Sequence, residues 1–218
     1  MITLFGSLAS GNVHKVQLIL RFINQPFLRV EVSQAKGETK RPELLKLNPM
    51  GKFPVLLLES GDVLSESNAI LFYFAKDTRL WPDDTRTQTE VLRWLFFEQY
   101  SHEPTLAVIR HLSRYVKDPH KYTKHIQSLK PKARHALLVL EQQLQSHLWL
   151  ASDRCTVADY ALYPYTRTAN ESGFNLADYP AIEKWLSQVE AQPNFLPMGV
   201  EGAQNVQGFY EYFQGNRP

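Results

Sequence analysis

Cysteine is almost absent from this chain of 218 residues, because Cys155 is the only one. A single cysteine cannot form an internal disulfide, and it excludes a zinc site built from several cysteines. No apolar run approaches the roughly 20 residues that a membrane-spanning helix needs. The first residues contain neither a basic nor a long apolar segment, so we expect no signal peptide and no membrane association. These absences favour a soluble protein of the cytoplasm, where thiols stay reduced.

The sequence also has little excess charge. Its 24 Lys and Arg residues are nearly balanced by 22 Asp and Glu residues, which leaves a net charge of +2. We therefore expect neither a nucleic acid nor an anionic membrane as a partner. The 7 histidines are scattered without the spacing of metal ligands, so we expect no metal site. With 44% hydrophobic residues, the chain can form one large domain or two small ones.

Residues 1–76 alternate between strand-like and helix-like segments. Their order is β-α-β, then a short helix that begins with proline, then β-β-α. This order indicates a mixed sheet with a helix packed on each face. The predicted strands are residues 2–6, 27–32, 54–58 and 63–64, and the predicted helices are residues 13–23, 42–47 and 65–76.

The composition changes after this alternating part. Residues 79–87 contain the segment LWPDD and are typical of a linker. Beyond them we find no convincing strand, and helices are predicted over residues 88–116, 121–148, 156–170 and 180–192. The sequence therefore predicts an α/β domain over residues 1–78, a linker over residues 79–87 and an all-helical domain over residues 88–218.

A polar turn, GSLASGN over residues 6–12, joins the first predicted strand to the first predicted helix. The start of a helix leaves backbone N–H groups unpaired and carries a partial positive charge. Ser10 stands where an N-cap is expected, which is the commonest role of serine there. The same position suits a hydroxyl that contacts a bound anion, and the two roles are compatible.

Three motifs give the chain a family resemblance: NPMGKFPVLLL over residues 48–58, VLSESNAI over residues 63–70 and TVADYAL over residues 156–162. By their order and spacing, the chain resembles a soluble bacterial glutathione transferase over essentially its whole length. The resemblance implies a thioredoxin-like N-terminal domain that binds glutathione, an all-α C-terminal domain and a homodimer. It also implies a cis peptide bond between Phe53 and Pro54, although trans is the ordinary state.

The resemblance assigns a catalytic role to the opening turn. A positioned donor there stabilises the glutathione thiolate, whereas a free thiol has a pKa of about 8.5. The chain has no tyrosine before Tyr73 and no cysteine in this turn, which implies a serine-type enzyme. Ser10 is the predicted sulfur contact and Asn12 a second donor, while Ser7 is the rival hydroxyl.

The two later turns would bind the rest of glutathione. After a cis Pro54, Val55 would present its backbone N–H and C=O to the cysteinyl part like an added strand, with Phe53 beside it. Glu66 would pair with the γ-glutamyl ammonium, and the Ser67 hydroxyl and N–H would hold its carboxylate. Both residues are also common at the start of a helix.

The glycyl carboxylate of glutathione needs a cation or a donor. Lys40 and Lys52 are the candidates, and either could instead be a solvated surface lysine. Related bacterial proteins often have glutamine near the position of Thr39. Because this chain has threonine there, a contact between this position and glutathione is left open.

The helical domain is expected to line the pocket of the second substrate. Tyr100, Glu103 and Arg110 are the candidates, although aromatic residues at helical spacing, such as Trp94, Phe97 and Tyr100, more often belong to the core.

Three other features have a structural interpretation. Thr156 and Asp159 have the spacing of a capping box. Cys155 is expected to be a small buried side chain rather than a nucleophile. His14 is expected at the surface or at the edge of the cleft.

The predicted activity is that of a glutathione transferase, in which the thiolate attacks a small hydrophobic electrophile. Glutathione would be the co-substrate, and no other cofactor is expected. Two alternatives stay open. One is a glutathione-dependent disulfide-bond oxidoreductase acting on a disulfide, which the pairing of a serine turn with Asn12 favours. The other is a non-catalytic ligand-binding protein with the same fold.

Overall fold

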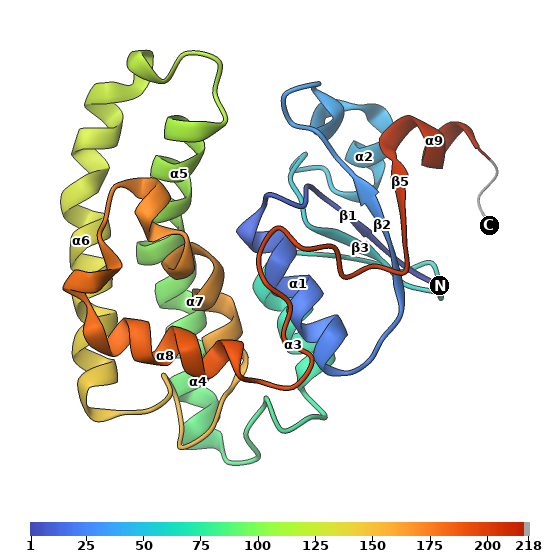
Figure 1. The fold of residues 1–218 in the computed structure, drawn as a ribbon. Helices are drawn as coiled ribbons and strands as arrows, with labels where there is room; N and C mark the ends of the chain where they lie inside the picture. The colour runs from blue at the N-terminus through green and yellow to red at the C-terminus, as the bar shows by residue number, and fades with distance from the viewer. Residues whose placement is uncertain (216–218) are drawn as a thin grey trace. The chain divides into compact units, whose positions relative to one another are not determined.

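The chain forms two compact units in a computed structural model, which describes residues 1–215 (Figure 1). The first unit is Met1–Ala75 together with the chain from Pro193 onward, and the second is Lys76–Gln192. The first contains a mixed sheet with helices, and the second is helical. The predicted fold class is therefore confirmed.

The first unit is built on a five-stranded sheet in the order β4-β3-β1-β2-β5. β1 runs parallel to β2 and antiparallel to β3, and β2 runs parallel to β5. The strands are β1 (Ile2–Phe5), β2 (Phe27–Glu31), β3 (Val55–Leu57), β4 (Val63–Ser65) and β5 (Asn205–Gly208). The helices are α1 (Gly11–Phe22), α2 (Pro42–Leu47), α3 (Ser67–Ala75) and α9 (Phe209–Gln214), with a 3-10 turn at Glu38–Lys40.

Helices cover both faces of this sheet, as predicted. Neighbouring residues of a strand point to opposite faces, and β1 shows the consequence. Leu4 belongs to a core cluster with residues of α1 and α3, whereas Phe5 belongs to a cluster with residues of α2 and α9. The first cluster includes Val13, Val16, Leu20 and Ile70, and the second includes Leu44, Phe209 and Tyr212.

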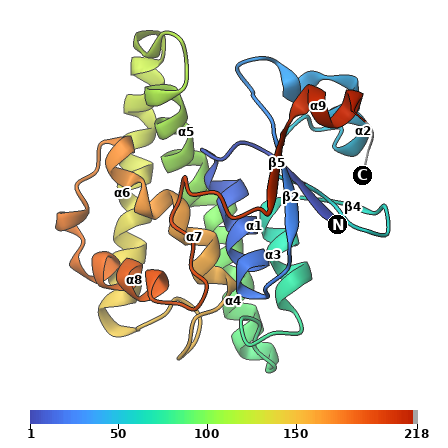
Figure 2. The ribbon, with the colours of Figure 1, turned by 45° about the vertical axis from the view of Figure 1, so that its right-hand side comes forward.

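The end of the chain departs from the prediction. β5 adds a strand to the free edge of β2, with Arg29 opposite Val206 (Figure 2). The prediction that residues 88–218 form an all-helical domain is therefore wrong from Pro193 onward. β5 is mostly exposed and lacks the apolar alternation that identifies a strand. Its pairing depends on β2, which lies far away in the sequence.

The second unit is a set of helices around a core rich in aromatic residues. Trp94, Tyr160, Tyr163 and Trp185 are almost fully buried there. The helices are α4 (Thr85–Phe97), α5 (Glu103–Arg114), α6 (Thr123–Ser146), α7 (Val157–Arg167) and α8 (Pro180–Glu190), and a π-helical turn, Glu98–His102, joins α4 to α5. Shorter 3-10 turns are Pro119–Tyr122, Ala169–Ser172 and Leu176–Asp178.

The predicted linker is anchored in the second unit. Leu80 is fully buried, and its carbonyl oxygen accepts a hydrogen bond from the Val157 N–H at 3.1 Å.

The capping box at the start of α7 is confirmed. The Thr156 side chain accepts a hydrogen bond from the backbone of the first turn of the helix, and the Asp159 side chain accepts one from the Thr156 N–H. Cys155 is buried, as expected.

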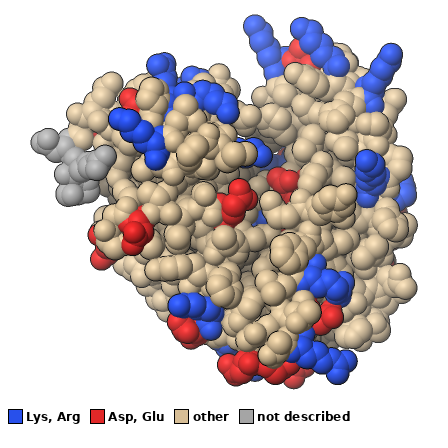
Figure 3. Space-filling model, turned by 180° about the vertical axis from the view of Figure 1, so that it is seen from behind, with Lys and Arg blue, Asp and Glu red and all other residues tan. Residues whose placement is uncertain are grey.

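The surface shows no extended area of one charge on the face drawn in Figure 3, where basic and acidic residues are interspersed and most residues are uncharged. Among residues 1–215, no three His, Cys, Asp or Glu side chains gather as metal ligands. In the same part of the chain, every helix is too short or too polar to cross a membrane.

His14 is fully buried in α1, so the expected surface position is wrong. Its Nε2 lies 2.7 Å from the carbonyl oxygen of Leu196, which belongs to the segment that returns to the first unit. Burial lowers the pKa of His14 from 6.5 to about 4, and the hydrogen bond only partly offsets this. The ring is therefore neutral at pH 7, and Nε2–H donates to the carbonyl.

This depressed pKa predicts a loss of stability in mild acid. Because the folded pKa lies below the unfolded pKa, protons bind preferentially to the unfolded chain. The His14 contribution is fully present above pH 6.5 and is lost as the pH falls toward about 4. Between pH 7 and pH 5 it amounts to about 2 kcal/mol of unfolding free energy. Urea unfolding of wild type and His14→Gln at both pH values measures it.

The control is His147→Gln, which changes an exposed histidine. We expect this variant to keep the wild-type pH dependence, whereas His14→Gln flattens it by about 2 kcal/mol. Equal pH dependence in all three proteins would contradict the assignment.

Candidate functional site

The sheet register brings the predicted site segments to one end of the first unit. Val55, at the start of β3, lies opposite Phe5 at the end of β1 and opposite Ser65 at the end of β4. The turn after β1, the loop before β3 and the turn after β4 therefore emerge at the same end of the sheet. These segments are residues 6–10, residues 53–54 and residues 66–67.

The loop before β3 has the backbone geometry that the resemblance implied, because the Phe53–Pro54 bond is cis. Val55, however, is paired on both sides, with Phe5 and with Ser65. A paired residue directs its N–H and C=O at a neighbouring strand, so its backbone is committed to the sheet. The predicted docking of a ligand on the Val55 backbone is therefore wrong. Phe53 takes part in none of these strand pairings and is the position left for an extended ligand.

The opening turn is held by its own backbone and hydroxyl groups. Ser10 is the N-cap of α1, and its Oγ accepts from the Val13 N–H at 3.3 Å, which confirms the capping interpretation. The Ser7 Oγ accepts from the Ala9 N–H at 3.4 Å, and the Ser7 carbonyl accepts from the Ser10 N–H at 3.0 Å. A hydroxyl that accepts keeps its own O–H to donate. Both serines therefore stay candidates for the sulfur contact.

A polar cluster links the opening turn to the start of α3. The Ser67 hydroxyl donates to the Asn12 Oδ1 at 3.3 Å. The Lys15 Nζ, on a fully buried side chain, donates to the Ser67 Oγ and to the Asn68 Oδ1, each at 3.4 Å. The Asn12 Oδ1 thus accepts a hydrogen bond from Ser67, and the side chain joins the opening turn to the start of α3. Lys15 was not among the predicted site residues, although a charged residue between the apolar positions of α1 could have indicated it.

Glu66 has a backbone conformation that needs a reason. Its φ is +67°, in the left-handed region, and its carbonyl accepts from the Ile70 N–H at 3.0 Å as α3 begins. This conformation costs a residue with a side chain about 1 kcal/mol or more. Such residues cluster at ligand clamps, and here the side chain is exposed while Ser67 is buried. The turn therefore holds an exposed carboxylate at the end of the sheet.

The two candidate lysines differ in their surroundings. Both are exposed. A Cβ placed on Gly51 would lie 2.9 Å from the Lys40 Nζ, so the Lys40 ammonium lies against the loop that leads to Phe53. The Lys52 carbonyl accepts from the Asn48 Nδ2 at 2.9 Å, which fixes the backbone of the same loop. Thr39 is buried beside Lys40.

The residues predicted to line the second-substrate pocket lie within the helical unit. Tyr100, on the π-helical turn, is 88% exposed, whereas Trp94 is core. Arg110 is nearly buried and donates to Glu171 at 2.9 Å and to the Tyr115 hydroxyl at 2.8 Å. Its guanidinium therefore has structural partners. The pocket role of Tyr100, Glu103 and Arg110 stays a prediction.

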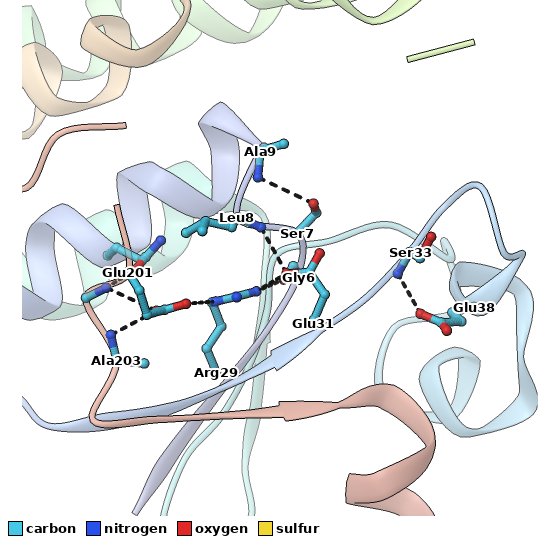
Figure 4. Close-up of polar contacts among 12 residues, drawn as sticks. Gly6, Ser7, Leu8, Ala9, Arg29, Glu31, Ser33, Glu38, Glu201 and Ala203 are labelled. Carbon is cyan, nitrogen blue, oxygen red and sulfur yellow. Dashed lines mark hydrogen bonds and ion pairs between the residues drawn. The ribbon is translucent and has the colours of Figure 1, made fainter. Parts of the chain in front are cut away.

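The structure also reveals an ion-pair cluster below the opening turn that the sequence analysis missed. Arg29 donates to the Gly6 carbonyl, Glu31 and Glu201 (Figure 4). The sequence feature that could have indicated this cluster is the pair of charged residues, Arg29 and Glu31, in a strand that is otherwise apolar. Their partner Glu201 could not be anticipated, because it is 172 residues away in the sequence.

Comparison with known proteins identifies the family. Residues 9–77 match the family model described as "Glutathione S-transferase, N-terminal domain", and residues 105–193 match "Glutathione S-transferase, C-terminal domain". The chain belongs to the glutathione S-transferase family. A glutathione S-transferase of solved structure from Pseudomonas fluorescens Pf-5 is 40% identical, with a TM-score of 0.88 over 90% of this chain and 98% of its own.

Two further relatives are more distant. The disulfide-bond oxidoreductase YfcG of Escherichia coli K12 is 29% identical over 189 residues, which cover 84% of this chain and 87% of its own. The glutathione transferase URE2P6 from Phanerochaete chrysosporium, solved in complex with oxidized glutathione, is 26% identical. Its TM-score is 0.79, over 88% of this chain and 92% of its own. In this member of the glutathione S-transferase family, β5 and α9 lie outside both segments that match the family models.

Proposed function

We propose that the chain binds glutathione at the end of its sheet and activates it as a thiolate for transfer to a small hydrophobic electrophile. The observation that carries the proposal is the register of β3, which gathers the opening turn, the cis-proline loop and the Glu66 turn at one end. Membership of the glutathione S-transferase family supports it, as does the relative from Phanerochaete chrysosporium in complex with oxidized glutathione.

The three parts of glutathione have chemically suitable partners. The Phe53 backbone can pair with the extended cysteinyl part. Glu66 offers a carboxylate to the γ-glutamyl ammonium, and Ser67 begins a helix where a carboxylate is favoured. The buried Lys15 ammonium, 3.4 Å from the Ser67 Oγ, adds a positive charge at that place. Lys40, against the loop before Phe53, is the better placed cation for the glycyl carboxylate.

The reaction follows from thiolate supply. The Ser10 O–H, at the N-terminus of α1, donates to sulfur and favours loss of the thiol proton to solvent. The thiolate then forms a bond to the electrophilic carbon, and the leaving group departs with its electron pair. Asn12 is proposed as a second donor. No covalent enzyme intermediate is needed, because positioning and charge stabilisation supply the rate gain.

A disulfide-bond oxidoreductase is the second candidate function. It is supported by the relative of that name in Escherichia coli and by the Asn12 side chain beside the serine turn. Here the glutathione thiolate would attack one sulfur of a disulfide and form a mixed disulfide. The S–S bond breaks, and the other sulfur leaves as a thiolate that takes a proton from solvent.

Parallel assays separate these functions. The purified chain is given glutathione with an aryl halide electrophile or with a model disulfide, and product formation is followed in each. Conjugate formation without disulfide reduction supports the transferase, and the reverse supports the oxidoreductase. If the chain binds glutathione but catalyses neither reaction, the result supports a non-catalytic binding protein.

The homodimer stays a proposal as well. On α4 and the turn that follows it, Leu92, Phe96 and Tyr100 recur every fourth residue and are 40%, 69% and 88% exposed. Such a stripe is an apolar surface that pairing of two copies would bury.

A further inference from the structure

A buried arginine lies below the opening turn. Arg29, on β2, is only 4% exposed. Its Nη1 donates to the Gly6 carbonyl oxygen at 2.9 Å and to the Glu31 carboxylate, and its Nε donates to the Glu201 Oε2 at 2.7 Å (Figure 4). The planar guanidinium can serve these three acceptors at once because its donors point in fixed, different directions. A lysine ammonium has no such fork.

Glu31 fixes a second point of the same turn. It stands two residues after Arg29, on the same face of β2. Its Oε2 accepts from the Leu8 N–H at 3.3 Å. The Arg29–Glu31 ion pair therefore binds two backbone groups of the turn. Arg29 donates to the Gly6 carbonyl, and Glu31 accepts from the Leu8 N–H. Bonds to charged groups are the stronger and more directional kind, so the backbone on either side of Ser7 has little freedom.

Glu201 connects this ion pair to the end of the chain. Its Oε1 accepts from the N–H groups of Gly202 and Ala203, each at 3.0 Å. The Gly202 N–H also donates to the Gln17 Oε1 of α1 at 3.0 Å. The chain then enters β5, which pairs along β2. This segment lies outside the two family matches, yet it holds the partner of Arg29.

We propose that Arg29 and Glu201 are positioning residues for the sulfur-contacting turn, so that the C-terminal segment determines how strongly the protein stabilises a bound thiolate. This inference rests on the proposed function. Donors stabilise a developing charge best when they are already fixed in place.

The test follows the thiolate absorbance of bound glutathione against pH in wild type, Arg29→Lys and Glu201→Gln. We expect the thiol pKa to rise by about 1 in each variant, which is about tenfold less thiolate at a fixed pH below it. Glu201 is partly exposed, so Glu201→Gln should fold normally. The controls are Arg93→Lys and Glu90→Gln, which alter an exposed ion pair of the helical unit and should leave the thiol pKa unchanged.

The outcomes are distinct. An unchanged thiol pKa in both variants, with a depressed pKa in wild type, would overturn the positioning role alone. Weaker glutathione binding at an unchanged thiol pKa would also overturn it, because that result indicates only structural support. A wild-type protein that binds glutathione with an ordinary thiol pKa would overturn the proposed function itself.

Discussion

Replacing Asp159 by alanine is expected to lower the free energy of unfolding by about 4 kcal/mol, a large part of the roughly 5–15 kcal/mol typical of a domain. Asp159 is fully buried. One carboxylate oxygen accepts from the Leu150 N–H at 3.1 Å and the Trp185 Nε1–H at 2.9 Å. The other accepts from the Thr156 N–H at 2.8 Å and the Thr156 hydroxyl at 3.1 Å.

The expected cost comes from the donors left behind. Burial raises the pKa of Asp159, and the bonds from Thr156, Trp185 and Leu150 act in the opposite direction. Alanine removes the acceptor of three buried N–H groups at once, and each unsatisfied group costs about 1–3 kcal/mol. Because these donors belong to the α7 cap, the 147–151 loop and α8, the change loosens three parts of the helical unit together.

Urea unfolding of three variants tests this prediction. Asp159→Asn keeps an acceptor for Leu150 and Trp185 but places an NH₂ group against the Thr156 N–H, so we expect about half the loss. Asp153→Ala changes an exposed aspartate of the neighbouring loop and is expected to stay within about 0.5 kcal/mol of wild type. An Asp159→Ala protein as stable as Asp153→Ala would show that the buried carboxylate is not an anchor of the helical unit.

Replacing Gly6 by alanine is expected to cost about 3 kcal/mol and to displace the opening turn. A Cβ at this position would lie 2.3 Å from the Val13 Cγ2 and 3.3 Å from the Phe53 Cβ. Val13 cannot move aside easily, because it is fully buried and branched at Cβ. The Gly6 N–H also donates to the Val30 carbonyl at 3.0 Å, and its own carbonyl accepts from Arg29. The backbone is therefore held while the new methyl group has no space.

A double-mutant cycle isolates this contact. If the clash with Val13 dominates, Gly6→Ala should cost clearly less in a Val13→Ala background than in wild type, with a coupling of about 1 kcal/mol or more. The control is Gly208→Ala, whose Cβ would meet nothing closer than 3.8 Å and whose φ is −72°. Additive effects of Gly6→Ala and Val13→Ala would refute the steric account.

Local chemistry made the first unit predictable up to α3. Prolines and glycines mark the loop before β3, and apolar spacing marks α1, so the order of elements and the site segments could be inferred from residues 1–76. The cis bond before Pro54 required the family resemblance, because the sequence by itself favours trans. The role of the Val55 backbone was misjudged, since the two-sided pairing of β3 follows only from the register.

Contacts between distant parts of the chain could not be predicted. His14 was expected at the surface or at the edge of the cleft, and it is buried where the returning segment places the Leu196 carbonyl against it. Arg29 and Glu31 lie within the predicted strand 27–32, but their role could not be inferred, because it depends on Glu201 and on the backbone of the opening turn. A parallel edge strand such as β5 leaves no local pattern, since its partner alone stabilises it.

Ser10 is the residue through which we propose that the opening turn stabilises the sulfur of glutathione. The most direct measurement is the thiolate absorbance of bound glutathione against pH in wild type, Ser10→Ala and Ser7→Ala. We expect a depressed thiol pKa in wild type and in Ser7→Ala, and a rise of about 1 or more in Ser10→Ala. An unchanged thiol pKa in Ser10→Ala, or a rise confined to Ser7→Ala, would show that Ser10 is not the sulfur contact.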